Sequence, residues 1–169
     1  YAELYDLGEL GGICVKGLTA APRIGNPPPR IAETPSGMLN AVGLQNPGLD
    51  CFLEQHLPWL RAQDTAVIAN IAGNTPEDYC AMAERLSDSD VDMIEMNISC
   101  PNVKQGGVQF GTSCENAAGI TAKVRRVCKK PLMVKLSPNV ADIGEIAAAV
   151  EAAGADAISL INTLTGMRI

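Results

Sequence analysis

The sequence of 169 residues has few aromatic side chains and an excess of acids over bases. Aromatic residues make up 4%, and 13 Lys and Arg stand against 19 Asp and Glu, for a formal net charge of -6. Nucleic-acid binding needs clustered cations to contact phosphates. The single basic run, residues 123–130, is better explained as the end of a helix, where the helix dipole favours cations. We therefore expect no nucleic-acid partner.

Metal-binding patterns are also missing. His56 is the only histidine, and the six cysteines form no C-x-x-C pair, their shortest spacing being 14 residues (114 − 100). This makes a zinc or iron–sulfur site within the chain a poor interpretation. The pattern is equally unlike a secreted disulfide framework, so reduced thiols and a cytoplasmic location are expected.

Long apolar runs are absent as well. No run approaches the ~20 residues that a membrane span requires, so no membrane segment is expected. The first residue is Tyr1 rather than Met, so a targeting segment could have preceded it.

What the sequence does contain is a regular alternation of aliphatic runs and amphipathic segments. Hydrophobic residues make up 47%. A helix end followed by a strand is predicted within residues 10–16. Beyond residue 64, strands and helices then alternate. Strands are predicted at residues 65–71, 91–98, 131–136 and 156–162, and helices at 75–86, 112–130 and 143–150. This alternation predicts an α/β fold with parallel strands joined by right-handed helical crossovers.

The helix boundaries carry their own signals. Thr75 followed by Pro76 and two acids is typical of a capped N-terminus. Residues 112–115 have the S/T-x-x-E form of a capping box, with Thr112 as the cap. The helix that follows must stop before Pro131. Gly154 can end the last predicted helix.

Each predicted strand after residue 64 ends in a polar residue. These are Asn70, Asn97, Lys135 and Asn162, separated by 27, 38 and 27 residues (97 − 70, 135 − 97, 162 − 135). Any one of them alone is explained by a turn. Four polar residues, one at the end of each successive strand, indicate a shared ligand site, because the carboxyl ends of parallel strands meet at one rim.

Residues 21–50 break this alternation with six of the eleven prolines and several glycines. Such a long irregular excursion in a compact domain is typical of a wall or lid over a site. A disordered linker is the alternative, but the many aliphatic residues argue against it. Asn40 and the apolar, tightly turned residues 41–44 lie within this excursion.

The predicted rim is rich in neutral amides and has no histidine and no obvious carboxylate pair. It lacks a phosphate-binding P-loop pattern as well. Amides both donate and accept hydrogen bonds, which suits a flat ligand with C=O and N–H groups, such as a pyrimidine or a flavin ring. The thiol of Cys100 is the best proton-transfer group present. The rim comprises Lys16, Asn70, Asn97, Cys100, Asn102, Lys135 and Asn162, with Asn40 from the excursion.

The residues from Asn97 to Gly111 closely resemble the active-site signature of the dihydroorotate dehydrogenases, in particular the NAD-linked class 1B catalytic subunits. The matching pattern is Asn-Ile-Ser-Cys-Pro-Asn-Val-Lys-x-Gly-Gly-x-x-Phe-Gly. Support extends along the whole chain. Further matches are Lys16 and residues 11–13, 22–27, 33–35, 39–48, 134–139 and 161–163.

The resemblance implies an FMN-binding (β/α)8 TIM barrel that oxidises dihydroorotate to orotate in de novo pyrimidine biosynthesis. In that reading Cys100 is the base that removes the C5 proton while hydride passes from C6 to the flavin. The implied substrate-binding residues are Lys16, Asn40, Ala41, Val42, Gly43, Leu44, Asn97, Asn102, Asn162 and Thr163. The implied FMN-binding residues are Lys16, Gly17, Asn70, Asn97, Lys135 and Ile161.

The resemblance also implies partners. Class 1B catalytic subunits pair with an electron-transfer subunit that carries FAD and a 2Fe–2S cluster and reaches NAD, around a homodimeric core within a heterotetramer. Membrane-bound class 2 relatives have serine at the base position, so Cys100 points to a soluble, cytoplasmic enzyme.

We expect residues 1–169 to form an incomplete barrel domain. About five strands are predicted, whereas such a barrel has eight and runs to about 250 residues. The first strand and the last two βα units, which usually hold the flavin phosphate, are expected to lie outside the chain. By itself the chain is then expected to bind FMN poorly and to be inactive.

Two alternatives remain open from the sequence. One is a related flavin barrel such as the pyrimidine-reducing domain of dihydropyrimidine dehydrogenase, against which Asn102 and the loop at residues 103–107 argue. The other is a catalytically inactive piece that only contacts a partner subunit.

Overall fold

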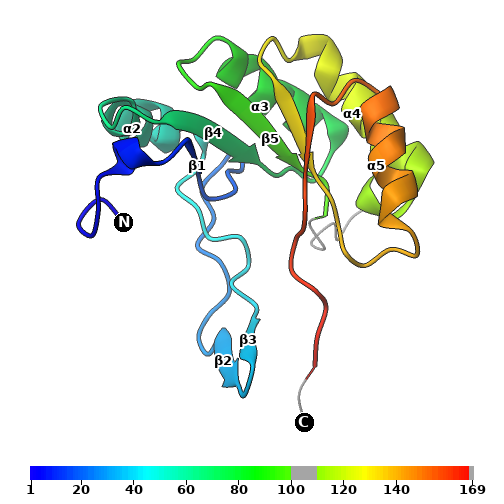
Figure 1. Cartoon of the computed structure of the whole chain (residues 1–169), viewed down its shortest axis with the longest axis horizontal. Helices are drawn as coiled ribbons and strands as arrows, with labels where there is room; N and C mark the ends of the chain where they lie inside the picture. The colour runs from blue at the N-terminus through cyan, green and yellow to red at the C-terminus, as the bar shows by residue number, and fades with distance from the viewer. Residues whose placement is uncertain (100–109, 168–169) are drawn as a thin grey trace.

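A computed structural model of the chain describes residues 1–99 and 110–167. Five parallel strands form one sheet in the order β1-β4-β5-β6-β7. The sheet is curled, as Figure 1 shows, so that the described part of the chain forms about half of a barrel. The strands of this sheet are β1 (Gly12–Cys14), β4 (Ala66–Ile71), β5 (Met93–Asn97), β6 (Leu132–Lys135) and β7 (Ala157–Ser159). The prediction of an α/β fold with an incomplete TIM barrel is confirmed.

Helices lie on the outer face of the sheet, and short helical segments precede β1 and β4 (Figure 1). The main helices are α3 (Pro76–Ser87), α4 (Cys114–Val127) and α5 (Ile143–Ala152). The shorter segments are η1 (Leu7–Glu9), α1 (Leu49–Cys51), η2 (Phe52–His56), α2 (Leu57–Arg61) and η3 (Phe110–Thr112).

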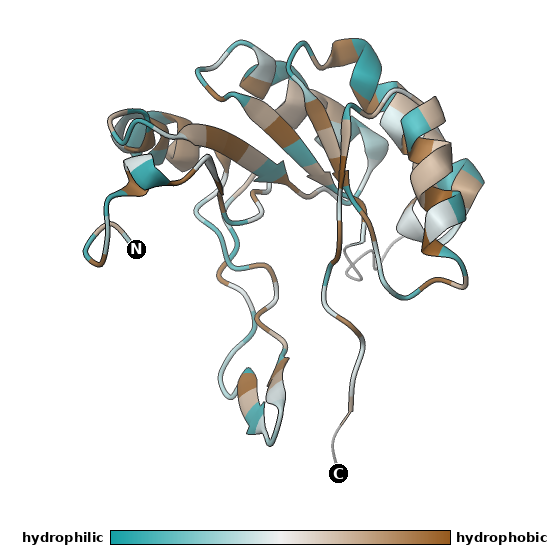
Figure 2. Ribbon diagram, viewed as in Figure 1, coloured by the Kyte–Doolittle hydropathy of each residue, from teal (hydrophilic) through white to brown (hydrophobic). Residues whose placement is uncertain are grey.

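The hydrophobic core fills the layer between strands and helices. Strand residues alternate between two faces, so Val67, Ala69 and Ile71 of β4 point outward and are fully buried under the helices. Helix α3 supplies the complementary face at a spacing of three to four residues, including Met82 and Leu86. Figure 2 shows the hydrophobic colour running along the strands. The opposite, inward face is left for polar side chains.

The predicted cap of α3 is confirmed, and the predicted cap of α4 is wrong by one residue. Thr75 accepts a hydrogen bond from Asp78 N, and the Asp78 side chain bonds back, a complete capping box. At α4 the cap is Ser113, which accepts from Asn116 N, and not Thr112. The helix ends at Val127 rather than reaching Lys130. Gly154, with φ +103°, ends α5 as predicted.

The segment between residues 49 and 61 is helical, which the sequence analysis did not predict. Leu49, Phe52, Leu57 and Leu60 recur at helical spacing and are buried. Pro58 has no N–H to donate to the carbonyl of Glu54, four residues earlier. The helix accommodates this with the wider π-type turn of η2 just before Pro58.

The excursion also contains unpredicted regular structure. Strands β2 (Ile31–Thr34) and β3 (Gly37–Asn40) pair as an antiparallel hairpin that reaches away from the sheet (Figure 1). The base of the excursion is closed where Arg23 and Asn46 exchange backbone hydrogen bonds of 3.0 Å each. The buried Asn46 side chain accepts from Thr19 N and Gly48 N, at 3.1 and 2.9 Å. The excursion is therefore ordered and is not a linker.

Strand β7 is shorter than predicted. It ends at Ser159, which pairs with Lys135, so Asn162 lies three residues beyond the strand. A backbone hydrogen bond of 3.1 Å from Asn162 N to Leu136 O nevertheless keeps the chain alongside β6. Asn162 thus returns to the rim from a loop and not from a strand.

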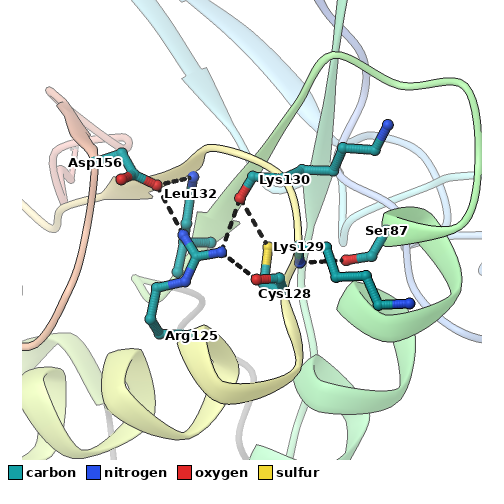
Figure 3. Close-up of polar contacts among 7 residues, drawn as sticks. All are labelled: Ser87, Arg125, Cys128, Lys129, Lys130, Leu132 and Asp156. Atoms are coloured by element: carbon teal, nitrogen blue, oxygen red, sulfur yellow. Dashed lines mark hydrogen bonds and ion pairs between the residues drawn. The ribbon is translucent and has the colours of Figure 1, made fainter.

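An Arg–Asp contact is repeated at the amino ends of the strands. Asp156, just before β7, accepts from Arg125 Nη1 at 2.7 Å and from Leu132 N at 2.8 Å. Figure 3 shows Arg125 reaching on to the carbonyls of Cys128 and Lys130. Asp92, just before β5, accepts in the same way from Arg61 and from Val67 N, at 2.6 and 2.7 Å.

The two contacts have the same spacing along the chain. Arg and Asp are 31 residues apart in both contacts. The contact of Arg125 with Asp156 lies 64 residues further along the chain than that of Arg61 with Asp92 (125 − 61, 156 − 92). The repeat therefore covers two βα units, as expected when successive units of a barrel are stacked in the same way.

Within the ranges described, no helix is both long and apolar enough to cross a membrane.

Candidate functional site

A cavity of about 730 Å³ opens at the carboxyl ends of the parallel strands. Its size lies within the range of small-molecule sites. It is lined by the segment after β1, the excursion, the ends of β4 to β6 and the segment after β7. The lining includes Cys14, Lys16, Gly17, Asn26, Asn40, Ala41, Val42, Gly43, Leu44, Asn70, Glu95, Asn97, Ser99, Lys135, Ser137, Asn139, Asn162 and Thr163.

The cavity brings together most of the residues that the sequence analysis selected. Lys16, Gly17, Asn40 to Leu44, Asn70, Asn97, Lys135, Asn162 and Thr163 all line it. Ile161 does not line it and is 43% exposed. Cys100 and Asn102 lie outside the described residues. The shared rim predicted from strand ends is thus confirmed as a place, while the role of each residue stays a prediction.

Lys16 and Gly17 reach the cavity because the chain continues beside β4 after β1 ends. Leu18 N donates to Asn70 O at 2.9 Å, and Ala72 N donates to Leu18 O at 2.8 Å. These bonds extend the parallel pairing by several residues. Gly17 lies tightly against Asn70: a Cβ atom there would be 2.8 Å from Asn70 Oδ1.

The excursion forms one wall of the cavity, as predicted. Asn26 Nδ2 donates to Ala41 O at 2.7 Å, and Asn26 N donates to Val42 O at 3.0 Å. Gly43 has φ +76°, and a Cβ there would lie 2.8 Å from Asn26 atoms. Only glycine therefore fits this turn. Residues 41–44 around this turn all line the cavity.

Asn97 and Asn162 meet across the rim. Asn162 Nδ2 donates to Asn97 Oδ1 at 3.1 Å, and Ser99 Oγ donates to the same oxygen at 2.9 Å. From the helix side, the buried Tyr79 hydroxyl donates to Asn97 O at 2.7 Å. Asn97 is therefore held on both its side chain and its backbone.

Lys16 and Lys135 give the cavity a positive character. In the described ranges the five ion pairs involve Arg61 (twice), Arg85, Arg125 and Lys129, and neither cavity lysine is in one. Both ammonium groups are thus available to an anionic or electron-rich ligand.

The structure adds a carboxylate that the sequence analysis missed. Glu95 lines the cavity, is only 5% exposed and accepts hydrogen bonds from Cys14, Asn70 and Ser159. The signal was available: Glu95 precedes Asn97 by two residues, so both lie on the same face of β5. Ser137 and Asn139 also line the cavity. They follow Lys135, the last residue of β6, at the same spacing of two residues.

Glu95 perturbs the Cys14 thiol. Burial, followed by the charge of Glu95 and the 3.2 Å hydrogen bond to it, raises the pKa of Cys14 from 9.0 to about 12, against a smaller opposite effect of Lys135. Cys14 therefore stays a neutral thiol at neutral pH and is a poor nucleophile or base.

The residues present fit the ring of a flavin. Asn70 is 4% exposed, and its Oδ1 atom has no hydrogen-bond partner among the described residues. Buried acceptors are normally satisfied, so this atom indicates a ligand that donates an N–H. Amides, two cations and an exposed backbone turn around one cavity match a flat ligand with N–H and C=O edges.

Comparison with known proteins identifies related sequences. The family model for dihydroorotate dehydrogenase matches residues 1–169. The chain is 57% identical over 169 residues to the protein named dihydroorotate dehydrogenase B (NAD(+)), catalytic subunit, of Alkaliphilus oremlandii. Proteins of the same name from Bacillus cereus and Thermoanaerobacter pseudethanolicus are also 57% identical, over 170 and 169 residues. All of this chain is covered, but only 55 to 56% of each relative, so the chain spans about half their length.

Proposed function

Because this chain belongs to the dihydroorotate dehydrogenase family, we propose that it forms the FMN-binding and substrate-binding half of a dihydroorotate dehydrogenase active site. The observation that carries the proposal is the cavity at the strand ends. It gathers Lys16, Asn97, Lys135 and Asn162 with the excursion wall, as the motif resemblance requires. The domain within residues 1–169 is then one part of a larger TIM-barrel domain.

The amides would hold the pyrimidine. Asn40, Asn97 and Asn162, with Thr163 and the backbone of residues 41–44, offer donors and acceptors from three segments of the chain: the excursion, the end of β5 and the segment after β7. The contact between Asn97 and Asn162 orients both groups before any ligand arrives. Preorganised donors and acceptors reduce the entropy lost on binding. Asn102 is proposed to join them from the loop after β5.

FMN would be held by Lys16, Gly17, Asn70, Asn97 and Lys135, and it would supply the hydride acceptor when bound. Ile161, which precedes the cavity residue Asn162 in the chain, is proposed to join them. Lys135 and Lys16, which both line the cavity, would supply positive charge to stabilise the electron density that the flavin gains on reduction. Cys100 takes the proton from C5 of dihydroorotate. The electron pair released from that C–H bond forms the C5=C6 double bond of orotate as hydride leaves C6.

The names of the relatives support a partner as well. They are catalytic subunits of an NAD(+)-linked enzyme. We propose that this protein likewise passes its electrons to a second subunit that carries FAD and a 2Fe–2S cluster and reaches NAD, around a homodimeric core. A cytoplasmic location is part of the same proposal.

The test uses this chain flanked by the parts of the Alkaliphilus oremlandii relative that precede and follow the matched region, so that the barrel is complete. Loaded with FMN and mixed anaerobically with dihydroorotate, this chimera should lose its flavin absorbance near ~450 nm as orotate forms. A bound flavin that stays oxidised in excess dihydroorotate would contradict the proposal.

The Cys100→Ala variant of the chimera should keep FMN bound but reduce it at least about 100-fold more slowly, since general-base catalysis contributes about that much or more. Cys51→Ala, on α1 away from the cavity, is the matched control and should react at the normal rate. The rate of flavin reduction should also rise with pH toward the pKa of the Cys100 thiol. Equal rates in both cysteine variants would exclude Cys100 as the base.

A further inference from the structure

Glu95 lies at the centre of the inward face of the sheet and connects strands that are not neighbours. Its Oε2 atom accepts from Cys14 Sγ at 3.2 Å and from Asn70 Nδ2, and its Oε1 atom accepts from Ser159 Oγ at 2.6 Å. The donors come from β1, β4 and β7, whereas Glu95 is on β5. These three hydrogen bonds make the burial of the carboxylate tolerable.

The contact with Glu95 decides which way the Asn70 amide faces. An ionised carboxylate only accepts hydrogen bonds, so the NH2 end of Asn70 must face Glu95. The reversed amide would set its oxygen against a carboxylate oxygen. Asn70 Oδ1 therefore points the other way, to the place where a Cβ on Gly17 would come within 2.8 Å.

This orientation leaves a buried acceptor without a donor in the described part of the chain. Asn70 is 4% exposed, and its Oδ1 atom is the single buried side-chain N or O atom found unpaired there. Asn70 and Gly17 both line the cavity, so this covered atom lies in the cavity wall. Unpaired buried acceptors are rare and need an explanation.

We propose that Glu95 is a positioning residue that holds Asn70 Oδ1 toward the cavity, where it accepts a hydrogen bond from a ring N–H of the ligand. This rests on the proposed function, which supplies two candidate donors: an N–H of the flavin and an N–H of the pyrimidine. Glu95 does not touch the ligand in this scheme. It acts through Asn70 by fixing the amide in the accepting orientation.

The experiment measures ligand binding in the completed chimera described above. The Kd of FMN is measured by quenching of flavin fluorescence, and the Kd of orotate by the change it causes in the absorbance of bound flavin. Glu95→Leu removes the acceptor that orients Asn70 and should weaken binding about tenfold, the loss of one good hydrogen bond. Glu95→Gln can still accept from Asn70 through its amide oxygen, and should stay within about threefold of the unchanged protein.

The two titrations identify the donor. A weaker FMN Kd assigns the N–H to the flavin, and a weaker orotate Kd with unchanged FMN binding assigns it to the pyrimidine. If both constants are unchanged in Glu95→Leu, or if Gln and Leu lose affinity equally, the proposal is wrong. Flavin reduction by dihydroorotate in the unchanged chimera tests the proposed function separately, so the two can fail independently.

A double-mutant cycle tests whether Glu95 acts through Asn70. In the Asn70→Ala background, Glu95→Leu should cause no further loss of affinity. An undiminished loss in that background would overturn the proposal. Ser159→Ala is the matched control, because it removes another partner of Glu95 without touching Asn70. If Glu95→Leu does not fold, Glu95→Met replaces it.

Discussion

At the scale of single residues, Cys14 shows how a neighbour decides the chemistry of a side chain. Its thiol is open to the cavity, yet burial of its sulfur and the Glu95 carboxylate together raise its pKa to about 12. The cavity therefore contains one thiol that is kept protonated. Cys100 would need a lowered pKa to serve as a base. A neighbouring cation lowers the pKa of a thiol, and Lys16 and Lys135 line the cavity without an ion pair among the described residues.

The first prediction concerns the reactivity of Cys14. In the 169-residue chain at about pH 8, iodoacetamide should modify Cys14 slowly, because only the thiolate reacts. Glu95→Gln removes the charge that helps raise the pKa, so the modification rate should increase, by about tenfold for each unit of pKa lost. Peptide mass spectrometry at timed intervals measures the rate. Cys51, on α1 and not among the residues that line the cavity, is the internal control and should react at the same rate in both proteins.

Cys14 also predicts a dependence of stability on pH. Its folded-state pKa of about 12 lies above the ordinary value of 9.0. Between pH 9.0 and about pH 12, the unfolded chain has therefore lost a thiol proton that the folded chain retains. Stability must then fall as pH rises from 9.0 toward about 12, and Cys14 has no such effect below 9.0. Urea unfolding at about pH 8 and about pH 10.5 should show a smaller fall for Cys14→Ala than for the unchanged chain. An equal fall would contradict the raised pKa.

At the scale of elements, the repeated Arg–Asp contacts join each helix to the strand that follows it and to the next strand along the sheet. Arg125 is 28% exposed and satisfies two backbone carbonyls in addition to Asp156. Asp156 in turn satisfies Leu132 N, the first backbone donor of β6. The contact therefore aligns the starts of β6 and β7 (Figure 3).

Removing this contact should destabilise the chain. Arg125→Met keeps much of the side-chain packing but leaves Asp156 and two carbonyls with fewer partners, which should lower the free energy of unfolding by about 1–3 kcal/mol. Urea unfolding measures the difference. Arg85→Met is the matched control, since Arg85 and Asp50 are 51% and 70% exposed and such a pair contributes less than about 1 kcal/mol. Equal effects of both substitutions would show that the repeated contact has no special role.

The strand and helix alternation was predictable because its signals are local. Caps such as Thr75 and the glycine at 154 depend on a few neighbouring residues, and both are as expected. The helix across residues 49–61 was missed because Pro58 is a helix breaker, and only burial of Leu49, Phe52 and Leu57 overrides it. The hairpin β2–β3 was missed for a similar reason, since it lies among six prolines.

At the scale of the whole molecule, the sheet of the described residues begins at β1 and ends at β7, and neither of these outer strands has a second partner there. Strand β7 is one edge, and the residues around it expose apolar side chains: Ile158, Leu160 and Leu164 are 36%, 65% and 67% exposed. Exposed edges with apolar side chains favour pairing with another chain. On this side of the sheet the cavity is lined by Asn162, Thr163 and Thr165, which follow β7.

The 169-residue chain expressed by itself should therefore self-associate and bind FMN weakly. Sedimentation velocity should detect species larger than the 17.7 kDa monomer at micromolar concentration, and Ile158→Lys, which adds a charge to the edge strand, should reduce them. The chimera with a completed barrel should be yellow and free of this edge-dependent association. A monomeric, yellow preparation of the 169 residues would contradict this prediction.

The sequence by itself determined the α/β class, the order of strands and helices after residue 64, the polar rim and the family. These depend on periodicity, caps and short motifs, which act between residues near one another in the chain. Only the tertiary structure decided that Glu95 lines the cavity and that the buried Asn70 Oδ1 atom has no hydrogen-bond partner among the described residues. The reason is the curl of the sheet, which brings β1 and β7, each two strands away from β5, within hydrogen-bond reach of one buried carboxylate.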